Sequence, residues 1–505
     1  MTMDFNQALQ CVSVVQRGDA SPPVTRIEYD SRRVGPGAVF VAMRGGRVDG
    51  NSFIAAAINN GAASVVTDSA EVFDALSRQH SQLGIARVEN GRRALAGISA
   101  NFFHHPERVL NLTGVTGTNG KTTTAFLLES LLRSAQKKCV LIGTIAYHLP
   151  GRVLPATHTT PESRDLLQLF AEGVALGSTE LVMEVSSHAL DQGRVWGLYY
   201  DTAIFTNLTQ DHLDYHGDME SYFRAKCLLF TGTGAAPPRV AVINADDPYG
   251  NRLAEIARST GSEVMKYGVS QCDFRAENIQ HAQRKTTFRM VTPSGATDIE
   301  TRLVGAVNVS NLLAAATAAY ARGLTLDEIH AGMATVASVP GRFQSVDCGQ
   351  QFTVIVDYAH TEDALRHVTR LARTLAASHG GRLITLFGCG GDRDRTKRPR
   401  MGKAAGEESD FVVLTSDNPR SEEPLDILQQ ILPGLTQTGT QYIVEPDRAT
   451  AIARAIRMAN DNDVVLLAGK GHEKVQILRD RTVPFDDAEV ARGAILNTQD
   501  QQAGK

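Results

Sequence analysis

Eight apolar segments, each followed by a loop rich in glycine or charge, constrain the fold of this 505-residue chain more than any other feature. Four of them lie between residues 110 and 244 and four between residues 352 and 468: LNLTGV, LVMEV, TAIFTN and VAVIN, then FTVIVD, RLITLF, FVVLT and DVVLLA. Continuous apolar runs of this length are typical of strands in parallel sheets, where ligands bind beyond the carboxyl ends of the strands. We therefore predict two doubly wound α/β domains that face a shared cleft. Any single loop could equally be an ordinary solvated connection, but eight together favour a functional role.

Two breaks divide the chain. Residues 24–68 predict strand, turn, strand, helix and strand of a small α/β unit, and a new strand begins after HHPE at 104–107. Pro340-Gly341 interrupts a helical pattern before the next apolar strand. The predicted fold class is α/β with three domains: a small N-terminal domain (1–102), a central phosphate-loop domain with a mostly parallel sheet (103–341) and a Rossmann-like C-terminal domain (342–505).

The composition of the chain excludes several classes of binding partner. Lys plus Arg (51) against Asp plus Glu (55) gives a net charge of −4, which supplies no basic field for a nucleic acid. No apolar run approaches the roughly 18 residues of a membrane span. The six cysteines have no Cys-x-x-Cys spacing, which indicates neither a zinc knuckle nor a disulfide framework. We expect a cytoplasmic monomer that acts on small molecules.

The sequence GVTGTNGKTT (114–123) lies between an apolar strand and a periodic helix, the context of a phosphate loop. Backbone N–H groups would surround the phosphates, Lys121 would neutralise them and the Thr122 hydroxyl can bind Mg²⁺. The strict Walker pattern requires glycine where Val115 stands, so the loop is a variant. The alternative is a glycine-rich turn without a nucleotide. The residues predicted to bind ATP here are Gly117, Thr118, Asn119, Gly120, Lys121, Thr122 and Thr123.

Two further polar residues follow neighbouring strands. Glu184 ends LVMEV, and His212 lies in the loop TNLTQDHLDYHG. Oxygen ligands suit a hard cation that bridges phosphates, and a second metal ion can accept imidazole. A surface carboxylate and a helix-capping histidine are equally good interpretations of these two residues. Lys226, in SYFRAKCLLF, resembles a solvated helix lysine.

Taken in order, these and further motifs closely resemble the Mur ligases of bacterial cell-wall synthesis, over nearly the whole chain. The motifs are GVTGTNGKT, EVSSHAL, TNLTQDHLDYHGDMESYFRAK, the GxxNxxN run from Gly305 to Asn311, VPGRF, VDYAHTEDAL, GCGGDRDRTKRP, SDNPR and AGKGHE. The family uses ATP to convert a carboxylate into an acyl phosphate, which an amine then attacks. Two anions meet in the first step, so cations held in place beforehand must screen their repulsion.

The resemblance implies that Lys121, Glu184, His212 and Lys226 form the catalytic centre. It implies one Mg²⁺ at Thr122 and Glu184, and a second metal ion at Glu184, His212 and Lys226, with Lys226 carbamylated by CO₂. A carbamate replaces a cation with an anion, which makes a metal role intelligible; an unmodified lysine is the alternative. The third domain is expected to close the adenine and ribose side of the site, and four residues match family positions near ATP: Asn308, Arg342, Asp357 and His360.

For a UDP-sugar dipeptide, the resemblance implies binding by hydroxyl, amide and guanidinium groups. The matching residues are Ser31, Gly46, Arg47, Val48, Thr159, Thr160, Ser186, Gln192 and Arg194. Thr159 and Thr160 could equally cap the helix that contains DLLQLF.

The incoming amino acid is implied by Asp417-Asn418-Pro419-Arg420, together with Arg393, Gly469 and Glu473. The far end of meso-2,6-diaminopimelate is a zwitterion whose carboxylate two arginines can pair and whose ammonium Glu473 or Asp417 can accept. Lysine lacks that carboxylate and would leave Arg420 unpaired. A β-turn is an additional interpretation of the four-residue motif.

The implied reaction is ATP-dependent addition of meso-2,6-diaminopimelate to the D-Glu carboxylate of UDP-MurNAc-L-Ala-D-Glu, in peptidoglycan precursor synthesis. Three alternatives remain: a lysine-adding ligase, a folylpolyglutamate synthetase and a nucleotide-binding module without turnover.

Overall fold

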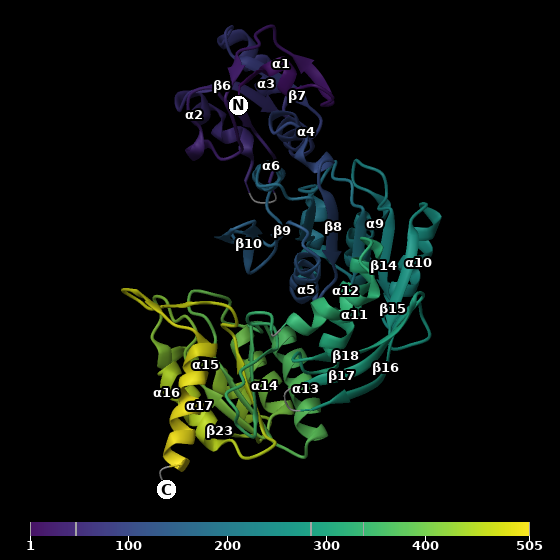
Figure 1. Ribbon diagram of the computed structural model, residues 1–505. Coiled ribbons are helices and arrows are strands. Elements are labelled where there is room, and N and C mark those ends of the chain that lie inside the picture. Colours follow the sequence, from purple (N-terminus) through teal and green to yellow (C-terminus); the bar gives the residue numbers. More distant parts are fainter. Residues whose placement is uncertain (1, 46–47, 283–284, 337, 504–505) are drawn as a thin grey trace. The chain divides into compact units, whose positions relative to one another are not determined.

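The computed structural model describes residues 2–45, 48–282, 285–336 and 338–503, which form two compact units (Figure 1). Unit 1 comprises residues up to Tyr267 and Ala316–Leu324, and unit 2 comprises Gly268–Ala315 and Thr325 onward. None of the described helices is long and apolar enough to cross a membrane. All six cysteines are free thiols.

The N-terminal part of unit 1 is a five-stranded sheet that helices cover. Its strand order is β2 (Val14–Arg17), β7 (Gly84–Val88), β6 (Ala62–Thr67), β5 (Ala38–Val41) and β4 (Arg26–Glu28). Only the β2–β7 pair is antiparallel. A short ladder joins β1 (Met3–Asp4) to β3 (Pro23–Val24), and the helices are α1 (Phe5–Ala8), α2 (Ile54–Asn59), α3 (Ala70–Gln79) and α4 (Gly91–Phe102).

The remainder of unit 1 is built on a mostly parallel sheet. Its strands run in the order β11 (Arg152–Pro155), β10 (Ala146–Leu149), β9 (Cys139–Ile142), β12 (Glu180–Glu184), β8 (Asn111–Thr116), β13 (Thr202–Phe205), β14 (Val240–Asn244) and β15 (Glu263–Gly268). Among these eight strands, every pairing from β9 to β15 is parallel, and the β9–β10 and β10–β11 pairings are antiparallel. The helices are α5 (Lys121–Ser134), α6 (Ser163–Ala175), α7 (Ser187–Gln192), α8 (Leu213–His216), α9 (Met219–Thr231) and α10 (Pro248–Ser259).

Unit 2 contains a six-stranded sheet with helices on both faces, as Figure 1 shows. The strand order is β19 (Gln344–Ser345), β20 (Thr353–Asp357), β24 (Val464–Ala468), β21 (Leu383–Phe387), β22 (Phe411–Leu414) and β23 (Gln441–Val444). One core packs α13 (Glu362–Ser378), α14 (Lys397–Glu408) and α15 (Pro424–Thr436) against it. The second core packs α16 (Arg448–Met458) and α17 (Asp487–Ala503) against the opposite face.

Three antiparallel strands, β16 (Phe274–His281), β17 (Thr286–Thr292) and β18 (Gly295–Thr301), also belong to unit 2, as do α12 (Leu326–Thr335) and the hairpin of β25 (Val475–Ile477) and β26 (Thr482–Pro484). Helix α11 (Ala306–Ala321) has residues in both units.

All eight predicted apolar strands are present, and the predicted fold class is confirmed. In each sheet, four of these strands lie side by side and parallel: β12, β8, β13 and β14 in unit 1, and β20, β24, β21 and β22 in unit 2. Their carboxyl ends therefore share one edge of each sheet, which is where the polar loops begin. The domain boundaries at 102 and 341 stay predictions.

Candidate functional site

The glycine-rich loop connects β8 to α5, as predicted. Gly117 has a φ of +147°, and a Cβ atom there would lie 1.9 Å from the Thr206 hydroxyl oxygen, so only glycine fits. Gly120 (φ +84°) immediately precedes α5 and offers no side chain to cap it. The first backbone N–H groups of an α-helix are not needed for the hydrogen bonds of the helix itself. They are suited to an anion.

The segment after β13 holds this loop in place. Asn207 accepts hydrogen bonds from the backbone N–H of Thr118, on its carbonyl oxygen at 2.8 Å, and of Asn119, on its side chain at 2.9 Å. In return, the Asn207 amide and the Thr206 hydroxyl donate to the Asn119 carbonyl at 3.1 and 2.6 Å. Sequence analysis did not identify these hydrogen bonds between the segment after β13 and the glycine-rich loop. The register that pairs Phe205 with Thr116 brings the two segments together.

Two lysines meet at the start of the loop. The Nζ atoms of Lys121 and Lys226 each donate to the Gly117 carbonyl oxygen at 2.8 Å. Lys226 is buried in α9, so the interpretation as a solvated lysine is wrong. Burial lowers its pKa well below the usual range, and the Lys121 charge lowers it further, against the opposite effect of Asp211.

Glu184 is buried at the end of β12, so the interpretation as a surface carboxylate is also wrong. Its Oε2 accepts hydrogen bonds from the hydroxyl groups of Thr122 at 2.9 Å and Thr144 at 3.0 Å, and its Oε1 accepts from the Thr144 N–H at 2.8 Å. Sequence analysis did not identify Thr144. This set of hydroxyl and carboxylate oxygens fits a hard divalent cation.

Within the described residues, no group of three or more His, Cys, Asp or Glu side chains could hold a metal ion. Magnesium in proteins is commonly bound by one or two carboxylates together with substrate phosphates and water. Thr122 and Glu184 are therefore consistent with a cation that arrives with a nucleotide.

His212 precedes α8 in a left-handed conformation (φ +53°) and makes no side-chain capping hydrogen bond, so its side chain is not a helix cap. Burial lowers its pKa; Asp211 opposes this, while Lys121 and Lys226 lower it further. The His212 ring lies edge-on to the Tyr222 ring, with centroids 6.1 Å apart, and the Lys226 Nζ lies 4.4 Å from that same ring, so His212 is close to Lys226.

Four of the predicted substrate-binding residues form one hydrogen-bonded group. The Thr160 hydroxyl donates to the Glu184 carbonyl at 2.9 Å and accepts from the Ser186 N–H at 3.1 Å. Arg194 donates to the Thr160 carbonyl at 3.0 Å and to the Gln192 side chain at 2.8 and 3.0 Å. Helix α6 begins at Ser163, so capping by Thr159 or Thr160 is wrong.

The other residues predicted to bind the UDP-sugar lie outside this hydrogen-bonded group. Thr159 hydrogen-bonds Thr144 at 3.0 Å, which links it to Glu184. Ser31 begins a short 3-10 helix, and its carbonyl accepts from the Asn60 amide at 2.9 Å. Val48 is exposed. Gly46 and Arg47 lie outside the described residues.

In unit 2, the residues predicted near ATP lie in two places. Asn308 is buried in α11 and donates to the Val304 carbonyl at 2.9 Å. Asp357 ends β20 and accepts from the N–H groups of Phe343 and Ala359. Burial raises the pKa of Asp357, which Arg342 opposes.

The Arg342 guanidinium lies over the Tyr358 ring at 5.2 Å. Tyr358 also contacts His360, with ring centroids 4.6 Å apart, and the His360 Nδ1 lies 2.9 Å from the Tyr358 carbonyl. Arg342 and His360 are thus brought together on one aromatic side chain that sequence analysis did not single out.

The residues predicted for the amino acid meet at the ends of β22 and β24. Asn418 donates to Glu473 Oε2 at 2.8 Å, and a Cβ at Gly469 would lie 2.6 Å from Asp417 Oδ2. Arg420 has a φ of +52° and donates to the Gly391 carbonyl at 2.8 Å.

The loops around this group have ordinary turn geometry. The β-turn predicted for residues 417–420 is not formed there, because the Arg420 N–H donates to the Ile477 carbonyl; the turn lies at 419–422, where the Pro419 carbonyl accepts from the Glu422 N–H. Arg393 donates to the Asp392 carbonyl at 3.1 Å. The buried Lys470, which sequence analysis missed, contacts both Asn418 and Glu473.

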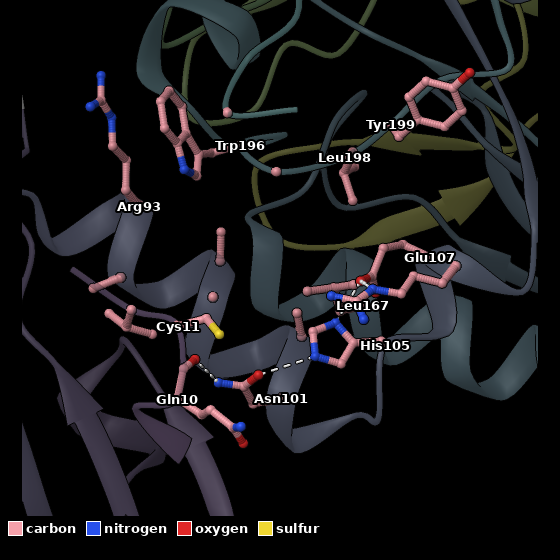
Figure 2. A pocket seen from close by; sticks show the side chains of 18 of the residues that line it. Gln10, Cys11, Arg93, Asn101, His105, Glu107, Leu167, Trp196, Leu198 and Tyr199 are labelled. Atoms are coloured by element: carbon pink, nitrogen blue, oxygen red, sulfur yellow. Dashed lines mark hydrogen bonds and ion pairs between the residues drawn. The ribbon is translucent and has the colours of Figure 1, made fainter. Parts of the chain in front are cut away.

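A separate cavity of about 900 Å³ lies in unit 1, between α4, α6 and the loop at 196–201. Figure 2 shows Arg93 beside Trp196 on one wall and His105 with Glu107 on another; the Arg93 guanidinium is 3.9 Å from the Trp196 ring centroid. The described residues that line it include no predicted site residue, so this cavity is not the candidate site.

Three family descriptions match this chain: Mur ligase family, catalytic domain, at residues 23–107; Mur ligase middle domain, at 115–319; and Mur ligase, glutamate ligase domain, at 341–471.

Individual proteins agree with these matches. The chain is 52% identical over 474 residues, 94% of each chain, to UDP-N-acetylmuramoyl-L-alanyl-D-glutamate–2,6-diaminopimelate ligase of Solibacter usitatus. A solved structure of a protein with that name is 31% identical, with a TM-score of 0.70 over 99% of this chain and 100% of that one. Folylpolyglutamate synthase of Mycobacterium tuberculosis, at 18% identity and a TM-score of 0.58 over 79% of this chain and 93% of its own, shares the fold.

Proposed function

Because the chain belongs to the Mur ligase family, we propose that it joins meso-2,6-diaminopimelate to the D-Glu carboxylate of UDP-MurNAc-L-Ala-D-Glu, with conversion of ATP to ADP and phosphate. The observation that carries this proposal is the 52% identity, over 94% of both chains, to a ligase of that name. The reaction belongs to peptidoglycan precursor synthesis. Six free cysteines agree with a cytoplasmic location.

The chemistry has two steps. An oxygen of the D-Glu carboxylate attacks the γ-phosphorus of ATP and ADP leaves; the amine of the amino acid then attacks the acyl carbon and phosphate leaves. Lys121, at the start of α5, neutralises charge that develops during phosphoryl transfer. The loop amides and the N-terminus of α5 orient the phosphates.

Thr122 and Glu184 would hold one Mg²⁺, and Glu184, His212 and Lys226 a second ion. Magnesium supplies positive charge that offsets the repulsion between carboxylate and triphosphate. The protein's own contribution is to orient Glu184, which Thr122 and Thr144 fix through both carboxylate oxygens.

Lys226 is proposed to carry a carbamate. Its amine is buried beside Lys121, an environment that disfavours a second ammonium and favours the neutral amine that reacts with CO₂. Protein incubated with ¹³C-bicarbonate should show a carbamate resonance in the NMR spectrum, and the Lys226→Met variant should not. An identical resonance in both proteins would contradict the assignment.

The remaining roles follow the family resemblance. Asn308, Arg342, Asp357 and His360 are proposed to contact ATP. The UDP-sugar dipeptide is assigned to Ser31, Thr159, Thr160, Ser186, Gln192 and Arg194. Arg393, Asp417, Asn418, Pro419, Arg420, Gly469 and Glu473 are assigned to the amino acid.

The decisive experiment measures phosphate release with ATP, UDP-MurNAc-L-Ala-D-Glu and a panel of amino acids. We expect release that depends on both the nucleotide and meso-2,6-diaminopimelate, with L-lysine a poor substrate. Preference for lysine would identify a lysine-adding ligase, and preference for a folate and glutamate would identify a folylpolyglutamate synthetase. ATP binding without release under any condition would indicate a binding module.

A further inference from the structure

Lys470 is a fully buried cation in the loop after β24, next to residues proposed to bind the amino acid. Its ammonium donates to three acceptors: Asn418 Oδ1 at 3.1 Å, Glu473 Oε2 at 2.9 Å and the Val475 carbonyl at 2.7 Å. A lysine ammonium has three hydrogens, so all of its donors are used within the protein. Lys470 therefore does not act by contacting a ligand directly.

The contacts of Lys470 fix the Glu473 carboxylate. Glu473 Oε2 accepts from both Lys470 and Asn418, so the three side chains form a closed triangle. Among the described residues, none donates a hydrogen bond to Glu473 Oε1. The Glu473 side chain is 30% exposed, so this second oxygen can accept from a bound molecule.

The positive charge of Lys470 also affects the two neighbouring carboxylates, Glu473 and Asp417. Burial raises the pKa of Glu473, but the charge and hydrogen bond of Lys470, with help from Asn418, lower it below the usual value. Asp417 lies against Gly469; burial raises the pKa of Asp417, and Arg448 and Lys470 oppose that effect. Lys470 thus favours the ionised form of both carboxylates beside which an ammonium would bind.

We propose that Lys470 is a positioning residue for the amino acid: it holds Asn418 and Glu473 so that the free carboxylate oxygen of Glu473 receives the distal ammonium of the incoming diamino acid. This inference rests on the proposed function. Methionine at position 470 would fill similar space but supply no hydrogen to Asn418 or Glu473. The Glu473 carboxylate would then lose its fixed orientation, which weakens binding of the ammonium more than it slows chemistry.

The test compares Lys470→Met with Lys474→Met, which removes an exposed lysine of the same loop that pairs with Asp486. In steady-state assays we expect Lys470→Met to raise KM for meso-2,6-diaminopimelate at least tenfold, while KM for ATP and for the nucleotide substrate changes less than threefold. kcat should fall by a smaller factor than the amino-acid KM rises. Lys474→Met should match the wild-type protein within twofold.

A Glu473→Gln background separates positioning from general support of the fold. There we expect Lys470→Met to change the amino-acid KM at most threefold, since the carboxylate that it positions is gone. A tenfold rise in both backgrounds, or an unchanged KM in the single variant, would overturn the inference.

Folding and function have their own controls. If Lys470→Met fails to fold, the test is the comparison of Lys470→Met/Glu473→Gln with Glu473→Gln, because the double variant has no unpaired carboxylate at position 473. An amino-acid KM that differs more than threefold between these two proteins overturns the inference. Absence of amino-acid-dependent phosphate release from the wild-type protein would overturn the proposed function and this inference together.

Discussion

At the level of single residues, the carbonyl oxygen of Gly117 is the point where two lysine side chains meet. Lys121 also donates to the Thr118 carbonyl at 2.8 Å, but neutral carbonyl oxygens offset little of the repulsion between an ammonium on the buried Lys226 and one on Lys121, so the arrangement favours either a neutral amine or an added anion. A triphosphate beside Lys121 and a carbamate on Lys226 would each supply negative charge. The same two residues thus connect nucleotide binding to the proposed lysine modification.

Replacing Lys121 with alanine tests the first of these roles. We expect phosphate release to fall at least about a hundredfold, because charge that develops during phosphoryl transfer loses the lysine proposed to neutralise it. The control is Lys138→Ala, which removes an exposed lysine that donates to the Leu176 carbonyl. Wild-type turnover by Lys121→Ala would contradict the role, and loss of turnover in both variants would point to a general effect.

Arg420 tests selectivity for the amino acid. Without the Arg420 guanidinium, the distal carboxylate of diaminopimelate loses its proposed charged partner, so Arg420→Ala should raise KM for diaminopimelate by about tenfold or more. KM for lysine should change less, which narrows the preference between the two substrates. Arg479→Ala, an exposed arginine paired with Glu423, is the control. Equal changes for both amino acids would contradict pairing with the carboxylate.

At the level of elements, the strands were predictable and the contacts between their loops were not. The apolar runs that became β8, β12, β20 and β24 could be identified because strands buried on both faces need continuous apolar sequence. In the amphipathic strands β16, β17 and β18, buried residues alternate with more exposed ones, and sequence analysis did not predict these strands.

The candidate site shows the same division. Lys121, Glu184 and Lys226 could be predicted because local motifs and family resemblance identify them. Asn207 and Thr144 could not, since their roles depend on strand order: Asn207 is 88 residues from the Asn119 that it contacts. Lys470 stands within a recognised motif, but its burial and its three acceptors appear only in the folded chain.

Arg448 and Asp487 join several elements of unit 2. They form a fully buried pair with contacts at 2.6 and 2.8 Å between the first residues of α16 and α17. Arg448 also donates to the carbonyl oxygens of Ser416 and Ala468, which immediately precede Asp417 and Gly469. The pair therefore fixes the bases of both loops proposed to bind the amino acid.

Removing Arg448 should accordingly be costly. We expect Arg448→Met to lower the free energy of unfolding by about 3–5 kcal/mol, since the Asp487 carboxylate stays buried without its partner. Denaturant titration of the variant measures this change. Arg454→Met, on the exposed side of the same helix, should change it by about 0.5 kcal/mol or less. If Arg448→Met/Asp487→Leu is no more stable than Arg448→Met, the unpaired carboxylate is not the cause.

At the scale of the whole molecule, the boundaries of the two compact units differ from the boundaries of the family matches. Unit 2 begins at Gly268 and includes β16, β17 and β18, whereas the family match at the C-terminal end begins at residue 341. Among the described residues, one core of the six-stranded sheet lies within residues 346–495, and the other includes Val304 as its one buried member from before residue 343. The C-terminal sheet thus depends little on the chain that precedes it.

A fragment of residues 342–505 should therefore fold by itself. Both faces of its sheet keep their helices, and the main loss is the buried Val304 side chain, worth about 1.5–3 kcal/mol. We expect dispersed amide resonances and one cooperative unfolding transition, with Val304→Ala in the full chain as a measure of that single contact. A fragment with collapsed dispersion, beside a full-length Val304→Ala protein of nearly wild-type stability, would show that the sheet requires β16, β17 or β18 and that the boundary at 341 is wrong.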